Sequence, residues 1–404
     1  MPSEAPPLRL MVVAGEPSGD ALGAQLMAGL KEMRPSVQFT GVGGPLMEAQ
    51  GLKSLYSLAD TSVMGLKEVV PKIPRILQRV REAAAFAIAT KPDLVILIDS
   101  PDFTHRIARR LKRLAPKLTV VKYVAPQVWA SRPWRAKKLA EFVDHLLALL
   151  PFEPEFFERY GLPTYFVGHP VIERMPQLAA NAGDAFRARY NIPPDAPLLA
   201  VLPGSRSNEI RFIMPQFLET ARRINAQLPA LHIVVPTVAH VRARVEEGLK
   251  SLEVPHVVVE SETDKFAALR AATAALAASG TVTTEVALAG TPQVVGYRLG
   301  WLTASIALRL FLLPYFTLLN IIAKEMIIPE FLQEECEPGH LMKALMPLMT
   351  SAEARAAQIS KTRDALKSLG AGAEAPSRRA ARAVLEIASR QEPRAISAGT
   401  AARG

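Results

Sequence analysis

The hydrophobic positions of this chain fall into short continuous runs that alternate with longer segments of helical periodicity. The runs at 94–98 and 198–202 contain no polar residue at all. Such runs are typical of parallel strands that are buried on both faces, and their alternation with helices predicts an α/β fold. Further strands are expected at residues 8–14, 37–40, 120–124, 145–150, 165–167, 232–236, 256–259, 274–278 and 292–298.

The strands form two series, which predicts two domains. A segment rich in Ala, Asn, Asp and Pro at 175–197 separates the series and is expected to be a linker with one short helix. A chain of 404 residues also exceeds the usual size of a single core. We expect domains at 1–174 and 175–350, helices at 338–349, 352–369 and 377–390, and a disordered tail at 391–404.

A strand-to-helix turn in the middle of the chain suggests an anion site. The strand at 198–202 ends in Pro-Gly, and Ser205 and Arg206 open the next helix. A helix start offers free backbone N–H groups, Gly204 permits close approach, and Arg206 can pair with a phosphate. An ordinary turn with a capping serine and a solvated arginine fits these residues equally well.

A second small-residue turn, Ser279-Gly280-Thr281, enters a helix that carries Glu285 one turn later. Two such turns in one domain make a diphosphate site plausible, and Glu285 could accept hydrogen bonds from ribose hydroxyls. Glu285 could equally be a first-turn carboxylate that the helix dipole favours.

Asp99 follows the apolar strand at 94–98, at the end of a parallel strand where catalytic groups collect. A carboxylate there can accept a proton from a substrate hydroxyl, although a helix cap or a loop salt bridge is an equally good interpretation. Trp129, in a loop with a basic run after it, could stack on a phosphorylated ligand; basic residues on a helix are more often a solvated face.

Charge and composition narrow the classes of partner. The net charge of +10 implies an anionic partner, either a nucleic acid, a phosphorylated metabolite or an acidic membrane surface. The chain lacks recognised RNA motifs and aromatic residues interleaved with basic ones, so we expect no nucleic acid partner. One cysteine, Cys336, and no zinc-type spacing of histidines fit a reducing cytoplasm and no metal site.

We expect the protein to contact the surface of a membrane and not to span the bilayer. The N-terminus shows no signal peptide, and the apolar stretch 301–328 is interrupted by charged and polar residues and Pro314. The apolar side chains near the basic helix at 73–89 could face a bilayer, although an ordinary amphipathic helix explains much of this pattern.

Seven motifs occur in an order that is more specific than any one of them. They are Ala-Gly-Glu-Pro-Ser-Gly-Asp at 14–20, Val-Met-Gly at 63–65 with Glu-Val at 68–69, Ile-Asp-Ser-Pro-Asp-Phe at 98–103, Leu-Pro-Gly-Ser-Arg at 202–206 with Glu209, Ala-Ser-Gly-Thr at 278–281 with Glu285, Val-Gly-Tyr-Arg at 295–298, and Pro-Glu-Phe-Leu-Gln at 329–333. With them the chain resembles the lipid-A-disaccharide synthases over residues 8–390. The chain has Ser131, Leu319 and Glu173 where that family commonly has Trp, Pro and Asp.

The resemblance implies a GT-B architecture, with two Rossmann-like domains facing each other across a cleft, and an inverting, metal-independent hexosyltransferase without a cofactor. The implied reaction transfers 2,3-diacylglucosamine from UDP-2,3-diacylglucosamine to 2,3-diacylglucosamine 1-phosphate (lipid X), which gives the β-1,6 disaccharide and UDP. It also implies homodimers that exchange C-terminal segments, so that helices at 351–390 pack on the N-terminal domain of their own or a partner chain.

The resemblance also assigns roles to residues. Asp99 is the implied general base, with Glu16 and Asn320 as further catalytic residues. Arg206 resembles the residue that stabilises the leaving diphosphate, together with Arg298. The remaining residues of the implied UDP site are Gly204, Ser205, Ser279, Gly280, Thr281 and Glu285.

Both substrates carry acyl chains and phosphate, so the resemblance and the charge agree on a peripheral protein at the cytoplasmic face of an anionic inner membrane. The expected membrane and acceptor surface includes part of 301–319 and the side chains of Val63, Met64, Leu66, Val69 and Trp129. Three alternatives remain: another GT-B enzyme acting on a UDP-sugar, an RNA-binding protein, and a membrane scaffold without activity.

Overall fold

The chain forms two compact units. The computed structural model describes residues 7–61, 66–130, 133–300 and 313–390, with the backbone alone for 66–72. The first unit extends to Pro170 and takes the chain back from Glu374, and the second unit is Val171–Ala373. Each unit is built on a six-stranded parallel sheet, in agreement with the two predicted series of strands.

The sheet of the first unit has the order β2-β1-β3-β4-β5-β6. Its strands are β1 Arg9–Ala14, β2 Gln38–Val42, β3 Leu94–Ile98, β4 Val120–Tyr123, β5 His145–Ala148 and β6 Thr164–Phe166. Successive side chains of β1 pack on opposite faces of the sheet. Leu10 and Val12 belong to the hydrophobic core on one face, and Met11 and Val13 belong to the core on the other face. A strand with two buried faces needs apolar residues at every position, which explains the continuous runs in the sequence.

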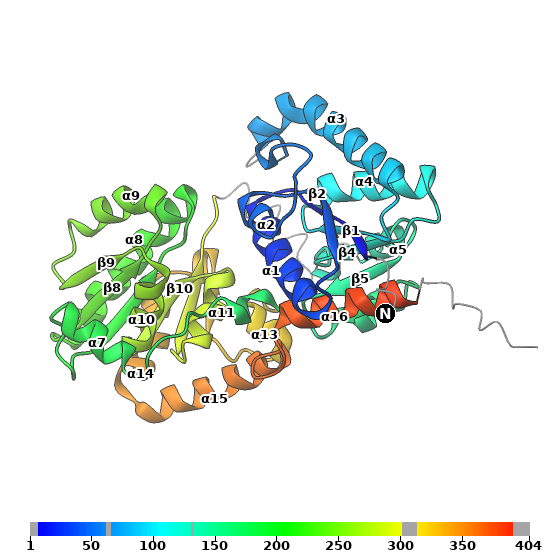
Figure 1. The fold of residues 1–404 in the computed structure, drawn as a ribbon. Helices are drawn as coiled ribbons and strands as arrows, with labels where there is room; N and C mark the ends of the chain where they lie inside the picture. The colour runs from blue at the N-terminus through cyan, green and yellow to red at the C-terminus, as the bar shows by residue number, and fades with distance from the viewer. Residues whose placement is uncertain (1–6, 62–65, 131–132, 301–312, 391–404) are drawn as a thin grey trace, which may run out of the picture. The chain divides into compact units, whose positions relative to one another are not determined.

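Helices cover both faces of this sheet. They are α1 Pro17–Met33, α2 Pro45–Ala49, α3 Leu66–Thr90, α4 Pro101–Leu114, α5 Arg135–Ala140, α6 Glu153–Glu158 and α16 Pro376–Ser389, with short 3-10 turns η1 Leu58–Asp60 and η2 Val128–Ala130. The C-terminal α16 lies along α1 (Figure 1). The two helices approach closely at Gly29, where an added Cβ would lie 3.3 Å from the Cβ of Ala381.

The sheet of the second unit has the order β12-β11-β10-β7-β8-β9. Its strands are β7 Leu198–Leu202, β8 His232–Pro236, β9 His256–Val259, β10 Ala274–Ala278, β11 Gln293–Tyr297 and β12 Glu330–Leu332. The sequence prediction ended this sheet at 292–298 and missed β12, which pairs in parallel with β11. The sequence of β12, Glu-Phe-Leu, begins with a charged residue and forms no continuous apolar run.

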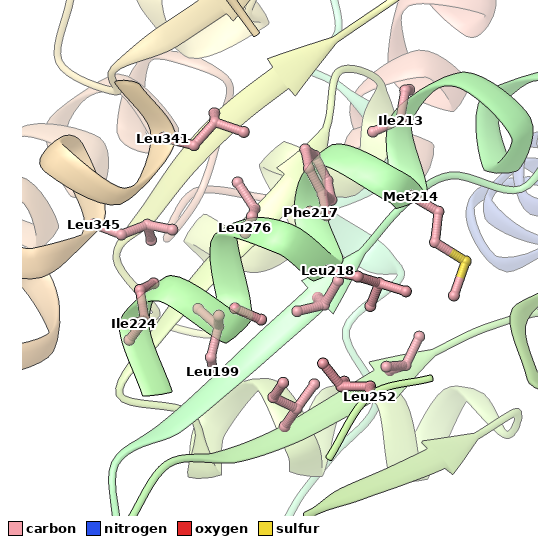
Figure 2. Packing of buried hydrophobic residues seen from close by; sticks show 14 of the residues in the cluster. Leu199, Ile213, Met214, Phe217, Leu218, Ile224, Leu252, Leu276, Leu341 and Leu345 are labelled. Carbon is pink, nitrogen blue, oxygen red and sulfur yellow. The ribbon is translucent and has the colours of Figure 1, made fainter. Parts of the chain in front are cut away.

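The helices of the second unit are α7 Ala182–Arg189, α8 Ser207–Gln227, α9 Ala239–Leu249, α10 Glu262–Ala271, α11 Thr281–Leu288, α13 Leu318–Ala323, α14 Pro338–Thr350 and α15 Ala352–Ser368, with 3-10 turns η3 Pro170–Glu173 and η4 Gln333–Glu335. Figure 2 shows part of the core, in which Leu199 and Leu276 of the sheet lie among Phe217 of α8 and Leu341 of α14.

The C-terminal helices divide between the two units. The sequence expectation placed 351–390 on the N-terminal domain, but α15 packs against α11, α13 and α14 of the second unit. Buried Gln358 holds it there, because its side-chain amide exchanges two hydrogen bonds with the backbone of Gln293 on β11, at 2.6 and 3.0 Å. Only α16 packs in the first unit.

No helix among the described residues is long and apolar enough to cross a membrane.

Candidate active site

A pocket opens in the second unit at the carboxyl ends of the strands. In the sheet, β8 and β9 lie on one side of β7, whereas β10 and β11 lie on the other side of β7. Ligands of open α/β sheets bind where the strand order reverses in this way. The pocket has a volume of about 420 Å³, and its walls include Gly204, Ser205, Arg206, Glu209, Thr237, Val238, Glu260, Glu262, Lys265, Ser279, Gly280, Thr281 and Glu285.

The turn between β7 and α8 is closed by the carboxylate of Glu209. Its Oε2 accepts hydrogen bonds from the backbone N–H groups of Ser205 at 2.9 Å and Arg206 at 3.1 Å, and its Oε1 lies 2.8 Å from Nη1 of Arg206. Two of the backbone amides at this turn, those of Ser205 and Arg206, are therefore satisfied within it. The Arg206 side chain is 79% exposed and lines the pocket, with Nη1 paired to Glu209.

Gly204 is required by this closure. Its φ of +113° is unfavourable for other residues, and an added Cβ would lie 2.4 Å from Oε2 of Glu209. The sequence contained the signal for Glu209, because a glutamate at the third helical position commonly hydrogen-bonds back to the start of its helix.

Glu285 is buried and already paired. Its carboxylate contacts Nζ of Lys265 at 3.0 Å and Nη1 of Arg174 at 3.4 Å. Lys265, on α10, also lines the pocket, and nothing in the sequence pattern marked it. The carboxylate that was expected to meet ribose hydroxyls is thus held in place by two cations.

Thr237 is a polar residue of the pocket that the sequence reasoning missed. It follows β8, and its buried Oγ1 has no hydrogen-bond partner among the described residues. A buried hydroxyl without a partner is uncommon and marks a place where a ligand atom can bind. Its position at the end of a parallel strand was the available signal.

In the first unit, Glu16 and Asp99 follow the adjacent strands β1 and β3, where the strand order of that sheet reverses. The two turns approach so closely that a Cβ on Gly15 would lie 2.5 Å from Oγ of Ser100. A pocket of about 440 Å³ beside them is lined by Glu16, Thr61, Ile73, Ile76, Leu77, Ser100, Pro101, Asp102, Phe103 and Arg106. Asp99 is next to this pocket in sequence but is not one of its lining residues.

Asp99 and Ser100 adopt a backbone conformation that is rare for such residues, with φ of +43° and +41°. Positive φ at two consecutive non-glycine residues stores strain, which the surroundings must stabilise. The hydroxyl of Thr104 donates to the carbonyls of Asp99 at 2.7 Å and Ser100 at 3.0 Å. Nζ of Lys122, a residue 1% exposed on β4, donates to the same carbonyl of Asp99 and to Thr104.

The charges of this cluster shift each other's pKa values. Burial raises the pKa of Glu16, the nearby negative charge of Asp99 raises it further, and Lys122 partly offsets both effects. Burial lowers the pKa of Lys122 to about 7, although Asp99 and Glu16 favour its charged form. A cluster of this kind suits proton transfer near neutral pH.

Comparison with known proteins identifies the family. A family model described as lipid-A-disaccharide synthetase matches residues 10–384. The lipid-A-disaccharide synthase of Rhodospirillum centenum is 45% identical over 384 residues, which cover 94% of this chain and 95% of that protein. That of Paramagnetospirillum magneticum is 46% identical, with coverage of 94% and 97%. The chain belongs to the lipid-A-disaccharide synthase family. The resemblance that its motifs indicated is therefore confirmed.

Solved structures of other proteins have a fold similar to that of this synthase family member. The calicheamicin glycosyltransferase CalG4 is similar with a TM-score of 0.58 and 18% identity, covering 96% of this chain and 100% of that one. The UDP-GlcNAc 2-epimerase of Methanocaldococcus jannaschii, solved with UDP-GlcNAc and UDP, is similar with a TM-score of 0.56 and 14% identity, covering 95% and 99%. The predicted α/β class and GT-B fold are confirmed.

Two residues that the synthase motifs assigned to the site, Asn320 and Arg298, do not line the pocket of the second unit. Asn320 is fully buried, and its side-chain amide is paired with the backbone N–H and carbonyl of Ile328 at 2.9 and 2.8 Å. This pairing ties α13 to the segment before β12, and the catalytic role that the resemblance implies for Asn320 stays a prediction. Arg298 follows β11, does not line the pocket, and lies near enough to Cys336 for its charge to lower the pKa of that thiol, against the larger raising effect of burial.

The expected membrane surface is only partly visible in this synthase. Val63 and Met64 lie outside the described residues, as does 301–312, and the side chains of Leu66 and Val69 are not described. Trp129 is half-buried, and its indole N–H donates to Oε1 of Glu153 at 3.0 Å. This tryptophan packs edge-on against Phe152, which gives it a structural role.

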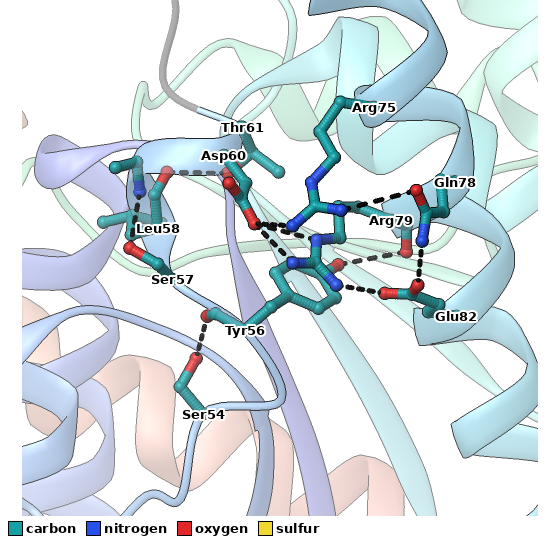
Figure 3. Close-up of polar contacts among 11 residues, drawn as sticks. Ser54, Tyr56, Ser57, Leu58, Asp60, Thr61, Arg75, Gln78, Arg79 and Glu82 are labelled. Carbon is teal, nitrogen blue, oxygen red and sulfur yellow. Dashed lines mark hydrogen bonds and ion pairs between the residues drawn. The ribbon is translucent and has the colours of Figure 1, made fainter.

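The positive charge of the basic helix α3 is partly neutralised by ion pairs. In Figure 3, Arg75 and Arg79 of α3 converge on Asp60, at 3.3 and 2.6 Å, and Arg79 also contacts Glu82. The ring of Tyr56 lies under the Arg79 guanidinium, 4.5 Å from ring centre to Cζ. These two arginines fasten α3 to the 56–61 segment and leave less free charge than the sequence suggested.

Proposed function

We propose that this protein transfers 2,3-diacylglucosamine from UDP-2,3-diacylglucosamine to the 6-hydroxyl of lipid X, producing the β-1,6 disaccharide 1-phosphate and UDP. Membership of the lipid-A-disaccharide synthase family supports the reaction. The observation that carries the assignment is the pocket of the second unit, which brings together all the residues expected to bind UDP except Arg298.

In this proposal the second unit binds the nucleotide. Arg206 neutralises the diphosphate and stabilises the negative charge that develops on UDP as it leaves. The free hydroxyl of Thr237 donates to a diphosphate or ribose oxygen, and the paired Lys265 and Glu285 meet the ribose. Cationic side chains supply this stabilisation, so we propose a reaction that needs neither a metal ion nor a cofactor.

The first unit supplies the base. Asp99 takes the proton from the 6-hydroxyl of lipid X as the oxygen bonds to C1 of the donor sugar and the bond from C1 to the diphosphate oxygen breaks. Attack from the face opposite UDP inverts the anomeric centre. Glu16, whose pKa is raised, lies beside this base and binds the acceptor or shares its proton.

We propose that the enzyme works as a peripheral protein on the cytoplasmic face of an anionic inner membrane, where its acylated substrates reside. The segment that contains Val63, Met64, Leu66 and Val69, together with part of 301–319, would insert among the lipids. We also keep the proposal of a homodimer, in which C-terminal segments are exchanged between chains.

The test is to incubate the purified protein with both substrates in detergent micelles and to follow disaccharide and UDP by mass spectrometry. Asp99→Asn should lower kcat by about a hundredfold or more, because a general base contributes this much. Asp93→Asn is the matched control, since Asp93 is an exposed carboxylate just before the opposite end of the same strand. EDTA should leave the rate unchanged. Consumption of the UDP-sugar without an acceptor would instead indicate an epimerase or a hydrolase.

A further inference from the structure

A second groove in the first unit is lined by four cationic side chains and one carboxylate. It lies between α4 and the η2–α5 segment, has a volume of about 500 Å³, and is lined by Pro101, Asp102, His105, Arg106, Arg109, Pro126, Val128, Arg135, Lys138, Leu139 and Phe142. Within the described part of the chain, none of the four cationic side chains of this groove forms an ion pair with a carboxylate. About half of the other arginines in the described part of the chain do form one, as Arg75 and Arg79 illustrate.

Two of the four cations are held in fixed positions one turn apart on α4. Nε of Arg106 donates to the backbone carbonyl of Asp102 at 2.9 Å, which leaves its two terminal amino groups free. The guanidinium of Arg109 lies over the ring of Phe142, with Cζ 4.6 Å from the ring centre, so its N–H edge remains available. Guanidinium groups that are fixed in advance lose less entropy when they bind an oxyanion.

His105 gives the groove a neutral polar wall. Its ring packs against Phe142 at 5.5 Å, and its buried Nε2 has no described hydrogen-bond partner. Burial, with the charges of Lys122 and Arg109, lowers the pKa of His105 to about 3. The imidazole is therefore neutral at neutral pH, and the groove does not rely on it for charge.

The groove adjoins the pocket beside Glu16. Pro101, Asp102 and Arg106 line both cavities, and all three belong to the first two turns of α4, directly after Asp99 and Ser100. A small molecule with one end in the Glu16 pocket and an anionic end in the groove would span this helix start.

We propose that the groove between α4 and α5 binds the phosphate monoester of the acceptor, so that Arg106, Arg109, Arg135 and Lys138 select lipid X by its 1-phosphate. This inference rests on the proposed function. A monoester carries close to two negative charges at neutral pH, which matches a concave site with several cations better than a singly charged phosphodiester does. The single carboxylate of Asp102, at the edge shared with the Glu16 pocket, is placed to meet sugar hydroxyls.

The experiment compares two double variants with equal loss of charge. Arg109→Gln with Arg135→Gln removes two cations from the groove, whereas Arg110→Gln with Arg113→Gln removes two cations from α4 that lie outside it. The groove variant should raise the KM for lipid X by about tenfold or more, with kcat and the donor KM unchanged, because each lost charge-assisted bond weakens binding by about that factor. The control variant should stay within about twofold of the wild type.

A second measurement compares lipid X with an acceptor that lacks the phosphate. For 2,3-diacylglucosamine without the phosphate, the wild type should show a KM raised by a similar factor, and the groove variant should no longer distinguish the two acceptors. Thermal unfolding followed by circular dichroism checks the fold. If the glutamine variant is unstable, Arg109→Lys with Arg135→Lys keeps the charge and should retain part of the selectivity.

Three results would overturn the inference. One is an equal rise in KM for both double variants, which would indicate diffuse attraction. Another is a wild type that does not distinguish the two acceptors. The third is a groove variant that binds phosphatidylglycerol vesicles less well but keeps its KM for lipid X in micelles, which would assign the groove to bulk lipid. If the wild type makes no disaccharide, the proposed function fails separately, and calorimetric binding of lipid X and its dephosphorylated form still decides the groove.

Discussion

Lys122 shows how one buried side chain can stabilise a strained turn at the proposed active site. Its amine and the Thr104 hydroxyl bind the carbonyl of Asp99, the residue proposed as the base, while the two residues of the turn keep positive φ. The arrangement makes Lys122 a positioning residue, since it acts on Asp99 through the backbone and not on substrate.

Lys122→Met should therefore lower kcat by about ten- to a hundredfold, the usual effect of a small misplacement of a catalytic group. UDP affinity should not change, because the pocket proposed to bind the nucleotide lies in the other unit. The charge of Lys122 lowers the pKa of Glu16, so its loss should move the acidic limb of the kcat/KM profile to higher pH. Lys117→Met, at an exposed lysine shortly before β4, is the control, and an unmoved acidic limb would assign Lys122 to stability alone.

His105 predicts a defined pH dependence of stability. Its pKa is about 3 in the folded protein and 6.5 when unfolded, so between these values the unfolded chain binds the additional proton. The free energy of unfolding should consequently fall as pH decreases from about 6.5 to 3. In His105→Gln this contribution is absent, so urea unfolding at pH 7.5 and 4.5 should show a smaller loss than in the wild type. Equal losses would contradict the prediction.

At the scale of single residues, the sequence predicted where candidate site residues lie along the strands and helices better than it predicted their hydrogen-bond partners. It placed Arg206 and Glu285 at the ends of strands and at helix starts, and both line one pocket. It did not foresee that Glu209 satisfies the amides of the turn, or that Asn320 binds the backbone of Ile328, because a hydrogen-bond partner depends on which loop packs nearby.

At the scale of elements, the strands were predictable because burial on both faces demands uninterrupted apolar runs. Among the described strands, only β12 was not predicted, because its three residues include a buried glutamate, Glu330. That carboxylate accepts hydrogen bonds from the backbone N–H groups of Phe316 and Thr317, a tertiary contact that no local pattern reveals.

The start of α8 gives a prediction at this scale. Gly204→Ala should weaken UDP binding and lower the free energy of unfolding, because the new methyl group combines an unfavourable φ with a clash against Glu209. Gly290→Ala is the matched control: Gly290 has a φ of +81° but no atom within 4 Å of the added Cβ. The control should lose about 1–2 kcal/mol from backbone strain alone. Gly204→Ala should lose about 1–3 kcal/mol more, as overpacked sites do, measured by urea unfolding and by calorimetric titration with UDP.

At the scale of the whole molecule, two strand series separated by a polar linker were sufficient to predict two units. The distribution of the last helices was not predictable from pattern, because nothing in the local sequence of α15 or α16 indicates which sheet each helix covers. Packing decides it: Gln358 binds β11 in the second unit, whereas Ala380, Val384 and Ile387 join the core around α1.

Ile387→Ala should accordingly destabilise the first unit, by about 2–5 kcal/mol as for other large-to-small core substitutions. Hydrogen exchange followed by mass spectrometry should show faster exchange in α1 and β1 and no change in α8, since α8 belongs to the second unit. Arg382→Ala, at an exposed position of the same helix, should change neither the stability of the first unit nor the exchange in α1 and β1. Faster exchange throughout the chain would mean that the two units unfold as one.

The return of α16 to the first unit makes that unit discontinuous along the polypeptide. On the ribosome, β1 to β6 emerge long before the helix that completes their cover. At about 5–20 residues per second, synthesis of the intervening second unit lasts roughly ten to forty seconds. During this time the apolar face of α1 lacks its final partner, so the nascent chain should depend on chaperones more than its mature stability suggests.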